Sequence, residues 1–318
     1  MLRKPRIFLT GAFGYLGLAL LTKLASDHEI VAFGHAPRNP AARSIIPTSV
    51  TVVEGDLADV AGAIRSHGSH APFQAVIHLA GGGGPHKCAA DPIAAIRANI
   101  RGTSGLLEAA RSVGVPRLLY ASTIAVYGTE RVPTGPYRES DQALPDDIYG
   151  VIKEAAEHVW TAIGGGTALR IANIYGSGSG VDLGVLGAVE RFARAAAIGG
   201  QARIFGTGEQ RIDYVHVDDV TLAFRKAIEA PGLPPAINVG GGAPISIAEL
   251  WSLCQRAGES LGARPTLERQ PAPPGKSWPD RSLAIDLAAQ VLGWRPQIGY
   301  EQGLTELVTM MRQAEAIQ

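Results

Sequence analysis

Short, almost uninterrupted apolar runs alternate with longer amphipathic segments through the first two thirds of the chain. A β-strand that is covered by helices on both faces has such a continuous apolar pattern. Strands that alternate with helices indicate right-handed βαβ crossovers and a parallel sheet. The pattern therefore predicts an α/β fold of the Rossmann type, with a doubly wound parallel sheet. We expect its strands at Arg6–Thr10, Glu29–Phe33, Thr51–Glu54, Ala75–Ala80, Arg117–Ser122 and Thr167–Ile171.

The segments between these runs have the apolar spacing of helices, and the alternation ends near Ile174. Helices are expected at Gly14–Ala25, Asp91–Val113 and Ile148–Ile163. Beyond them, a glycine- and serine-rich stretch, shorter apolar runs and a proline-rich segment indicate a smaller lobe. We predict a dinucleotide-binding domain over residues 1–174, completed by about 213–241, and a smaller C-terminal α/β substrate lobe over 175–212 and 242–318.

The charge and cysteine content narrow the expected compartment and partners. The chain carries 29 lysines and arginines against 29 aspartates and glutamates, so a nucleic-acid-binding surface is disfavoured. No apolar stretch approaches the roughly 20 residues that cross a bilayer. The two cysteines are far apart in the sequence, which fits a reducing compartment. We expect a cytoplasmic protein with no nucleic-acid or membrane partner, and the scattered histidines predict no metal site.

The strongest local signal is a glycine triplet after the first strand. Gly11, Gly14 and Gly17 are spaced GxxGxxG and lead into the first helix. Glycines at such a junction permit a tight turn, let backbone N–H groups approach a pyrophosphate and allow close helix–strand packing. The alternative, an ordinary glycine-rich turn, fits less well at the start of an alternating α/β chain. The candidate cofactor-binding residues of this loop are Gly11, Phe13, Gly14, Tyr15, Leu16 and Gly17.

The second strand bears on which dinucleotide is expected. NAD-binding strands at this place normally end in Asp or Glu, which bonds the adenosine ribose. Here the strand continues through Gly34 to His35 and Arg38, with no carboxylate. His35 and Arg38 can face a 2′-phosphate, so NADP is weakly favoured over NAD, although Arg38 is alternatively a solvated loop residue. After the third strand, Asp56 either accepts a hydrogen bond from adenine or caps a helix at Leu57.

A tyrosine and a lysine form the candidate reactive group. Tyr149 and Lys153 are four residues apart, so both side chains project from the same helix face. A free phenol has a pKa of about 10, and an adjacent ammonium, helped by the positive nicotinamide ring, favours the phenolate and lowers that pKa. Ser122 and Thr123 end the fifth predicted strand, at the edge where open α/β sheets bind ligands. Either hydroxyl can hold a substrate oxygen beside Tyr149, or make a local turn bond instead.

With these motifs, the chain resembles the extended short-chain dehydrogenase/reductase family, especially its nucleotide-sugar epimerases and reductases. The resemblance covers nearly the whole length. It rests on the glycine triplet, Asp56-Leu57, His78-Leu79-Ala80-Gly81, Ser122-Thr123, Val126-Tyr127-Gly128, Tyr149-x-x-x-Lys153, Asn173-Ile174-Tyr175-Gly176, Asp213-Tyr214, Asn238-Val239-Gly240 and Leu292-Gly293-Trp294.

The resemblance implies roles for particular residues. Thr123, Tyr149 and Lys153 are the implied catalytic trio, and Asn173 is implied to contact a substrate diphosphate. For Leu79 the alternative is a role in strand packing, and for Asn99 the alternative is an exposed amide on a helix surface. The implied cofactor-binding residues are Leu57, Leu79, Ala80, Gly81 and Asn99, together with Tyr149 and Lys153.

Two departures from the family pattern refine the expected reaction. Sugar-nucleotide dehydratases of the family carry an acidic pair after the catalytic hydroxyl, where this chain has Ile124 and Ala125. Without those acids, water elimination lacks an evident catalyst. The family often has arginine directly before Asp213, where this chain has Ile212. The remaining candidate substrate-binding cations are Arg203, Arg211 and Arg281, each alternatively a solvated surface charge.

These features predict an NAD(P)-dependent oxidoreductase that moves hydride at a carbon of a nucleoside-diphosphate sugar. The missing ribose-binding acid favours a 4-ketosugar reductase over the alternative, an NAD-dependent nucleotide-sugar 4-epimerase that uses the same trio. A non-catalytic dinucleotide-sensing protein is a further alternative, although a sensor has no need of the trio. A reductase of a non-nucleotide carbonyl is also open. The resemblance further implies a homodimer.

Overall fold

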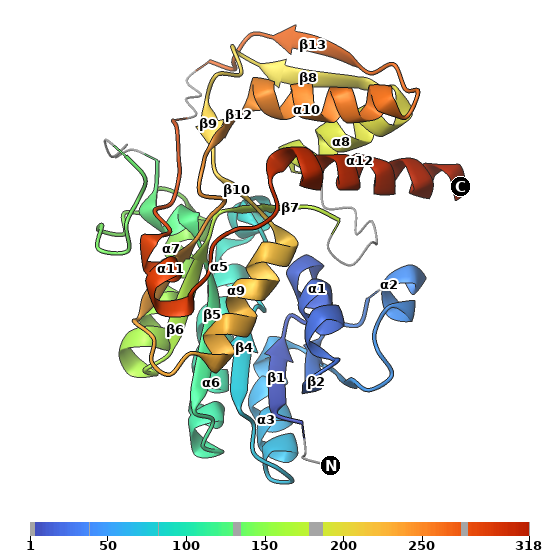
Figure 1. Cartoon of the computed structure of the whole chain (residues 1–318). Helices are drawn as coiled ribbons and strands as arrows, with labels where there is room; N and C mark the ends of the chain where they lie inside the picture. Colours follow the sequence, from blue (N-terminus) through green and yellow to red (C-terminus); the bar gives the residue numbers. More distant parts are fainter. Residues whose placement is uncertain are drawn as a thin grey trace.

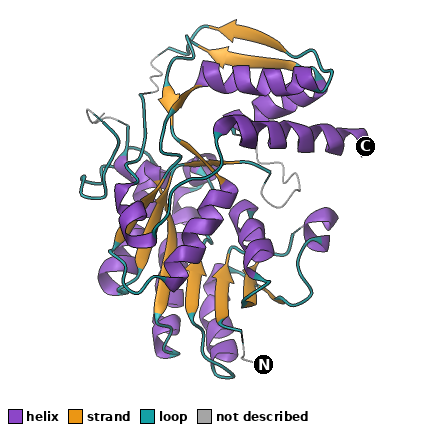
Figure 2. Ribbon diagram, in the orientation of Figure 1, coloured by secondary structure: helices purple, strands orange, loops and turns teal. Residues whose placement is uncertain are grey.

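The computed structural model describes residues 4–37, 39–81, 83–129, 135–177, 187–274 and 279–317. Its centre is a seven-stranded sheet in the order β11-β6-β5-β4-β1-β2-β3, in which all neighbouring strands pair in parallel. The predicted Rossmann-type sheet is thereby confirmed (Figures 1 and 2). The strands are β1 (Arg6–Thr10), β2 (Glu29–Gly34), β3 (Thr51–Glu54), β4 (Ala75–His78), β5 (Arg117–Thr123), β6 (Thr167–Ile171) and β11 (Ala236–Val239).

Helices cover both faces of the sheet, which is why its strands have continuous apolar runs. Ile7 and Leu9 of β1 point into one core, whereas Phe8 points into the core on the opposite face. The first core is covered by α1 (Tyr15–Leu24), α9 (Val217–Glu229) and α11 (Asp286–Leu292). The second core is covered by α3 (Val60–Gly68), α6 (Gly102–Ser112) and α7 (Ile148–His158).

Two of the predicted helices contain π-helical turns, one inside the helix and the other at its C-terminal end. The predicted helix Asp91–Val113 divides into α5 (Pro92–Ile96), a π-turn over Arg97–Arg101 and α6. The predicted helix Ile148–Ile163 consists of α7 followed by a π-turn over Val159–Ile163. Such turns are frequent at functional sites. Shorter elements are α2 (Pro40–Ser44), α4 (Pro85–Ala90) and the 3-10 turns Leu57–Asp59 and Ile124–Tyr127.

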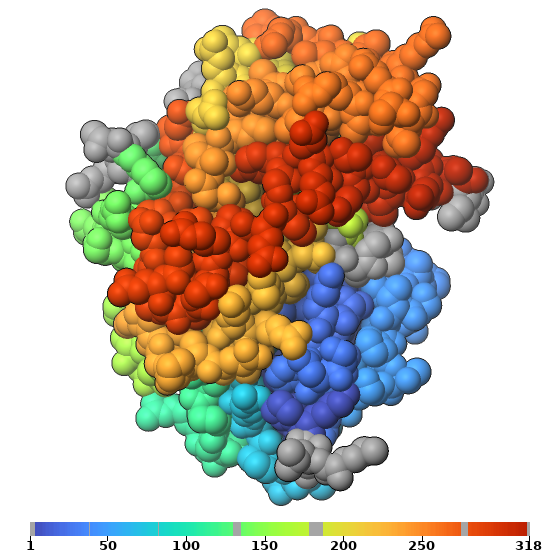
Figure 3. Space-filling view, viewed as in Figure 1, coloured from blue at the N-terminus to red at the C-terminus, as the bar shows by residue number. Residues whose placement is uncertain are grey.

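Part of the C-terminal half of the chain forms a third core above the sheet, seen in yellow to red at the top of Figures 1 and 3. The rings of Phe192 and Trp251 meet edge to face there, with centroids 5.5 Å apart. Its elements are α8 (Ala188–Ile198), β8 (Gln201–Phe205), α10 (Ile247–Ser260), β13 (Thr266–Gln270) and α12 (Tyr300–Ile317). Within the described chain, no helix combines the length and apolar character that crossing a bilayer requires.

Short strands connect the central sheet to the third core. β7 (Asn173–Tyr175) pairs in parallel with β10 (Tyr214–His216), and β9 (Arg211–Ile212) pairs with β12 (Ile245–Ser246). An isolated bridge joins Ile212 to Arg281. These links place Asn173 and Arg281 where the carboxyl edge of the sheet meets the C-terminal segments.

Candidate active site

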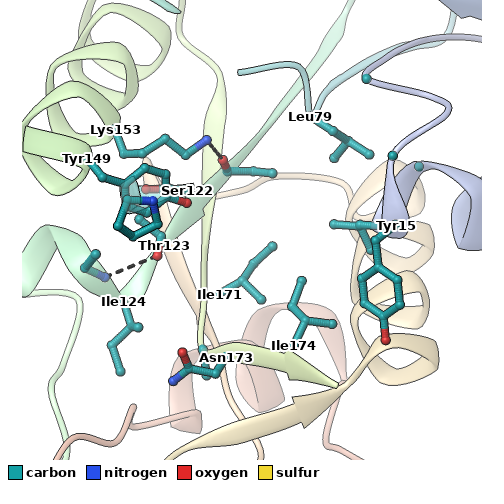
Figure 4. Close-up of a pocket in the computed structure, with 18 of the residues that line it drawn as sticks. Tyr15, Leu79, Ser122, Thr123, Ile124, Tyr149, Lys153, Ile171, Asn173 and Ile174 are labelled. Atoms are coloured by element: carbon teal, nitrogen blue, oxygen red, sulfur yellow. Dashed lines mark hydrogen bonds between the residues drawn. The ribbon is translucent and has the colours of Figure 1, made fainter. Parts of the chain in front are cut away.

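A cavity of about 450 Å³ opens at the carboxyl ends of β1, β5 and β6. In Figure 4, Tyr15 and Leu79 lie on one side of it, and Tyr149 and Lys153 lie on the other. Predicted cofactor, catalytic and substrate residues share this cavity. Those that line it are Gly11, Gly14, Tyr15, Leu16, Gly17, Leu79, Thr123, Tyr149, Lys153, Asn173 and Arg281.

The glycine loop has a geometry that only glycine allows at two positions. Gly11 has a φ of 66°, and a Cβ there would lie 2.7 Å from the backbone nitrogen of Ala80. A Cβ on Gly17 would collide with the backbone of Gly11 and Ala12. The first turn of α1 lines the cavity, and no described side chain caps it. Uncapped N–H groups and the positive helix end fit a dinucleotide pyrophosphate.

The two aromatic side chains of the glycine loop lie in different environments. The side chain of Phe13 is buried in the core, and its ring would lie 3.5 Å from a Cβ on Gly34. The ring packs under the second strand, so the predicted cofactor contact of Phe13 stays a prediction for its backbone alone. Tyr15 lines the cavity, and its hydroxyl donates to the carbonyl oxygen of Gly176 at 2.5 Å. This bond ties α1 to the segment after β7.

The predicted adenosine end lies outside this cavity and is solvent-exposed. His35 Nε2 lies 3.6 Å from Asp56 Oδ2, and the two side chains are 80% and 62% exposed. Asp56 caps the following turn by accepting a hydrogen bond from the Ala58 N–H at 2.9 Å. Leu57 packs against Gly102 of α6. Arg38 lies outside the described residues. The Asp56 carboxylate beside His35 would repel the predicted 2′-phosphate of NADP, so this geometry does not favour NADP.

The predicted trio meets at the junction of β5 and α7. Thr123 ends β5, and its hydroxyl accepts the Ala125 N–H at 3.2 Å. Tyr149 lies in the first turn of α7, which Asp147 caps by accepting the Gly150 N–H at 2.6 Å. One turn later, Lys153 Nζ donates to the carbonyl oxygen of Ala121 at 2.6 Å (Figure 4). Helix and strand thus hold the phenol, the amine and the hydroxyl around one cavity.

Burial controls the protonation of the trio. It raises the pKa of the Tyr149 phenol above its ordinary value, and a hydrogen bond with Thr123 partly offsets this rise. Burial also lowers the pKa of Lys153 to about 8, which the negative charge of Glu157 opposes. Burial is the largest influence on the phenol in this geometry, where the Lys153 ammonium donates to a backbone carbonyl. The predicted lowering of the tyrosine pKa, which the ammonium and a positive nicotinamide ring would cause together, stays a prediction.

The residues after β4 surround the trio from the opposite side. Leu79 lines the cavity, and the Ala80 N–H donates to the Thr10 hydroxyl at 3.3 Å. A Cβ on Gly81 would lie 2.7 Å from Asn99 Oδ1 and 3.9 Å from Lys153 Nζ. The Asn99 amide is buried and donates to the Ala95 carbonyl oxygen at 2.7 Å. Asn99 is therefore packed beside the trio and is not an exposed helix amide.

The predicted substrate-binding residues separate into two groups. Asn173 and Arg281 line both this cavity and a second cavity of about 820 Å³ between β8 and α8. The Asn173 amide donates to the Asp213 carbonyl oxygen at 3.1 Å. Arg203 lines only the second cavity, where it pairs with Glu268 at 2.9 Å.

Arg211 does not line either of these two cavities. Its guanidinium donates to the Pro244 carbonyl oxygen at 2.8 Å and to Glu249 at 3.3 Å. Successive residues of a strand point to opposite sides, so Ile212 of β9 faces the second cavity and Arg211 faces away. The position of Arg211 fits the alternative that it is a surface charge, and Arg281 is the described arginine that lines both cavities.

Sequence reasoning missed a buried cluster behind the trio. Glu157 follows Lys153 by four residues and bonds Ser122 and Arg170 in the interior. Its spacing after Tyr149 and Lys153 was the available signal, because it places all three on one helix face.

Comparison with known proteins agrees with this geometry. Residues 7–240 match the model of the NAD dependent epimerase/dehydratase family. This chain belongs to that family. A UDP-glucose 4-epimerase of Mycolicibacterium smegmatis is 31% identical over 316 residues, which cover 96% of this chain and 98% of the relative. The chain is thus an enzyme of the extended short-chain dehydrogenase/reductase type, as the resemblance implied.

Solved structures agree over the same length. A UDP-glucose 4-epimerase of Thermotoga maritima with UDP-glucose superposes with a TM-score of 0.86 at 26% identity, covering 98% of this chain and 99% of that chain. A UDP-glucose 4-epimerase of Thermus thermophilus in complex with NAD gives a TM-score of 0.81 at 28% identity, covering 97% and 99%. These comparisons support NAD and the epimerase alternative, and they do not support the predicted leaning to NADP and a 4-ketosugar reductase.

Proposed function

We propose that this protein is an NAD-dependent nucleotide-sugar 4-epimerase. The observation that carries the proposal is the convergence of Thr123, Tyr149 and Lys153 on the cavity that the glycine loop also lines. Two apolar side chains, Ile124 and Ala125, occupy the positions where a dehydratase needs its acids. Proton transfer to and from one sugar oxygen is the chemistry that such a site supports.

The glycine loop supplies the fit to NAD, because Gly11 and Gly17 allow close packing of the loop against the β4 end and of α1 against the loop, which leaves the uncapped N–H groups of α1 at the cavity. NAD held by this loop would supply the acceptor and donor of hydride for the sugar carbon, and return of the hydride to the opposite face of the intermediate ketone would invert that carbon. Tyr149 accepts the proton of the sugar hydroxyl and later gives it back. Thr123 holds the same oxygen, and Lys153 stabilises the phenolate.

The second cavity is the proposed place of the nucleoside diphosphate. Arg281 lines both cavities, which suits a diphosphate that joins the sugar to the base. Arg203 and Phe205 project from the same face of β8, and Phe205 is an exposed aromatic side chain that a base can stack on. The relatives' UDP-linked substrates make a UDP-sugar the first choice.

Two further expectations remain proposals. Ile93 and Ile96 of α5 and Val151 of α7 are exposed apolar side chains on neighbouring helices, which supports a homodimer through this face. Cys88 and Cys254 are free, buried and located in separate cores. Their reduced state is compatible with the cytoplasm expected from the sequence.

The proposal is tested with purified protein and no added cofactor. Mass spectrometry of the denatured protein should release NAD, and UDP-glucose or UDP-glucuronic acid should be converted into its 4-epimer without net NADH. Consumption of NADPH with a 4-keto sugar nucleotide, and no epimerisation, would instead establish the reductase.

A further inference from the structure

A buried glutamate lies behind the catalytic wall of the cavity. Glu157 is in the last turn of α7, four residues after Lys153 and eight after Tyr149, so the three side chains share one helix face. Its side chain is only 7% exposed. Carboxylates are rarely buried to this extent unless they are paired and hydrogen-bonded. The partners of Glu157 therefore indicate what it does.

Two residues on neighbouring strands satisfy this carboxylate. The Ser122 hydroxyl donates to Glu157 Oε2 at 2.5 Å. The Arg170 guanidinium donates to Oε1 through Nε at 2.9 Å and through Nη2 at 2.6 Å. Ser122 and Arg170 are direct neighbours in the register of β5 and β6. One carboxylate thus fastens α7 to two adjacent strands, directly beside Thr123.

The arginine is fixed in turn from its far side. Arg170 Nη1 donates to the Tyr127 hydroxyl at 2.9 Å, and that hydroxyl donates to Asn238 Oδ1 at 2.9 Å. The guanidinium carbon lies 4.9 Å from the centre of the Tyr127 ring. A buried polar network whose members are all bonded is rigid and holds one arrangement. The position of Glu157 is therefore determined by β5, β6 and β11.

The same carboxylate also influences the protonation of Lys153. The titratable groups that face the ammonium are Tyr149 and Glu157 on its own helix, His78 on β4, Cys88 on α4 and Tyr120 on β5. Burial lowers the pKa of His78 to about 3 and raises the pKa of the thiol and of both phenols, so these four are neutral at pH 7. Among these described groups, Glu157 is the larger source of negative charge on Lys153, and the Cys88 thiolate adds to it only at higher pH.

We infer that Glu157 is a positioning residue of this active site, which holds the helix of Tyr149 and Lys153 against the strand of Thr123 and keeps Lys153 in its ammonium form. The kinetic part of this inference rests on the proposed function, whereas the charge of Lys153 does not. Burial lowers the pKa of Lys153 to about 8, and Glu157 opposes that lowering. Without Glu157, the lysine loses its proton at a lower pH and no longer favours the phenolate.

The test is Glu157→Gln, which keeps the shape of the side chain and removes its charge. Heteronuclear NMR of protein with ¹³C-labelled lysine follows the titration of Lys153, which Lys153→Met assigns. We expect the midpoint to fall by about one pH unit from its wild-type value. The kcat for epimerisation should fall by about 10- to 100-fold, with KM changed by less than about 3-fold. An unmoved midpoint in the folded variant would overturn the inference.

Two variants separate the effect of charge from the effect of position. Glu154→Gln removes a carboxylate from the same helix on a half-buried face, and it should leave the Lys153 midpoint unchanged. Ser122→Ala removes one bond to Glu157 and keeps its charge, so kcat should fall by about 3- to 10-fold with no shift of the midpoint. A midpoint that moves equally in Glu154→Gln and Glu157→Gln would contradict the assignment of the charge to Glu157.

A third variant covers the case in which Glu157→Gln does not fold, because it leaves Arg170 buried without a counter-ion. Glu157→Gln combined with Arg170→Met removes both charges, and the Lys153 midpoint should still fall, by a smaller amount. A midpoint at or above the wild-type value would overturn the inference. Absence of epimerisation by the wild-type protein would refute the proposed function, whereas the NMR titration would still decide the role of Glu157.

Discussion

The two ends of the predicted cofactor site differ sharply in their surroundings. At the catalytic end, Lys153 is buried, donates to a backbone carbonyl and lies next to a network that reaches Asn238. At the adenosine end, His35 and Asp56 are largely exposed and 3.6 Å apart. Buried charges respond strongly to their neighbours, whereas exposed pairs contribute little. We therefore expect the chemistry to depend on the catalytic end and the choice of cofactor to depend on the adenosine end.

The largest expected effect is at the catalytic end. Tyr149→Phe removes the hydroxyl that carries the proton, so kcat should fall by about 100- to 10,000-fold while the bound NAD is retained. Steady-state kinetics and mass spectrometry of released NAD check both parts. Tyr300→Phe is the matched control, because its hydroxyl bonds the Ala243 carbonyl oxygen in the C-terminal lobe. Equal losses in the two variants would refute the special role of Tyr149.

A methyl group in the glycine loop should have the next largest effect. In Gly17→Ala the new Cβ meets the backbone of Gly11, which cannot move without displacing the loop. We expect the free energy of unfolding to fall by about 2–3 kcal/mol, together with a loss of bound NAD. Urea denaturation measures the stability.

The matched glycine control lies on α3. A Cβ on Gly62 meets nothing within 4 Å. Gly62→Ala should raise the free energy of unfolding by about 0.5–1 kcal/mol, because alanine is the better helix former. If both alanine variants changed stability alike, close packing at Gly17 would not be the cause.

The charge of Lys153 predicts a pH dependence of stability. Its pKa is about 8 in the folded protein against 10.5 ordinarily, so the buried ammonium opposes folding at neutral pH. Between these two values the unfolded chain binds more protons, and stability therefore rises with pH. Relative to Lys153→Met, the wild-type free energy of unfolding should increase by about 2–3 kcal/mol from pH 8 to pH 10.5. Parallel curves for the two proteins would show that Lys153 is not desolvated.

The smallest expected effects are at the adenosine end. His35→Ala should change the NAD dissociation constant by less than about 5-fold, because an exposed pair contributes at most about 1 kcal/mol. Asp56→Asn removes the carboxylate near the expected 2′-phosphate, and NADP should then bind about 3- to 5-fold more tightly. Isothermal titration of protein freed of NAD measures both constants. A tenfold or larger loss of NAD binding in His35→Ala would remove the difference between the two ends.

The sheet and the trio were predictable because their signals are local. Continuous apolar runs marked the strands, and the spacing of Tyr149 and Lys153 placed both on one helix face. The positions of side chains that depend on contacts between distant segments were not predictable. The Arg211 side chain faces away from the cavities because its two-residue strand, β9, pairs with β12, which is distant in the sequence. The Phe13 ring is buried beside Gly34 at the end of the second strand.

The protonation of the trio was also beyond the sequence. An adjacent ammonium suggested a lowered tyrosine pKa, but burial raises it, and burial is set by the whole fold. The cluster of Ser122, Glu157 and Arg170 likewise forms only when β5, β6 and α7 come together.

Hydride retention during epimerisation tests the central claim most directly. The protein is incubated with UDP-glucose in D₂O without added cofactor, and the product is examined by ¹H NMR. A Tyr149-dependent conversion into the 4-epimer that keeps ¹H at C4 is predicted, because hydride leaves and returns within one closed site. Deuterium at C4, or conversion that persists undiminished in Tyr149→Phe, would contradict the claim.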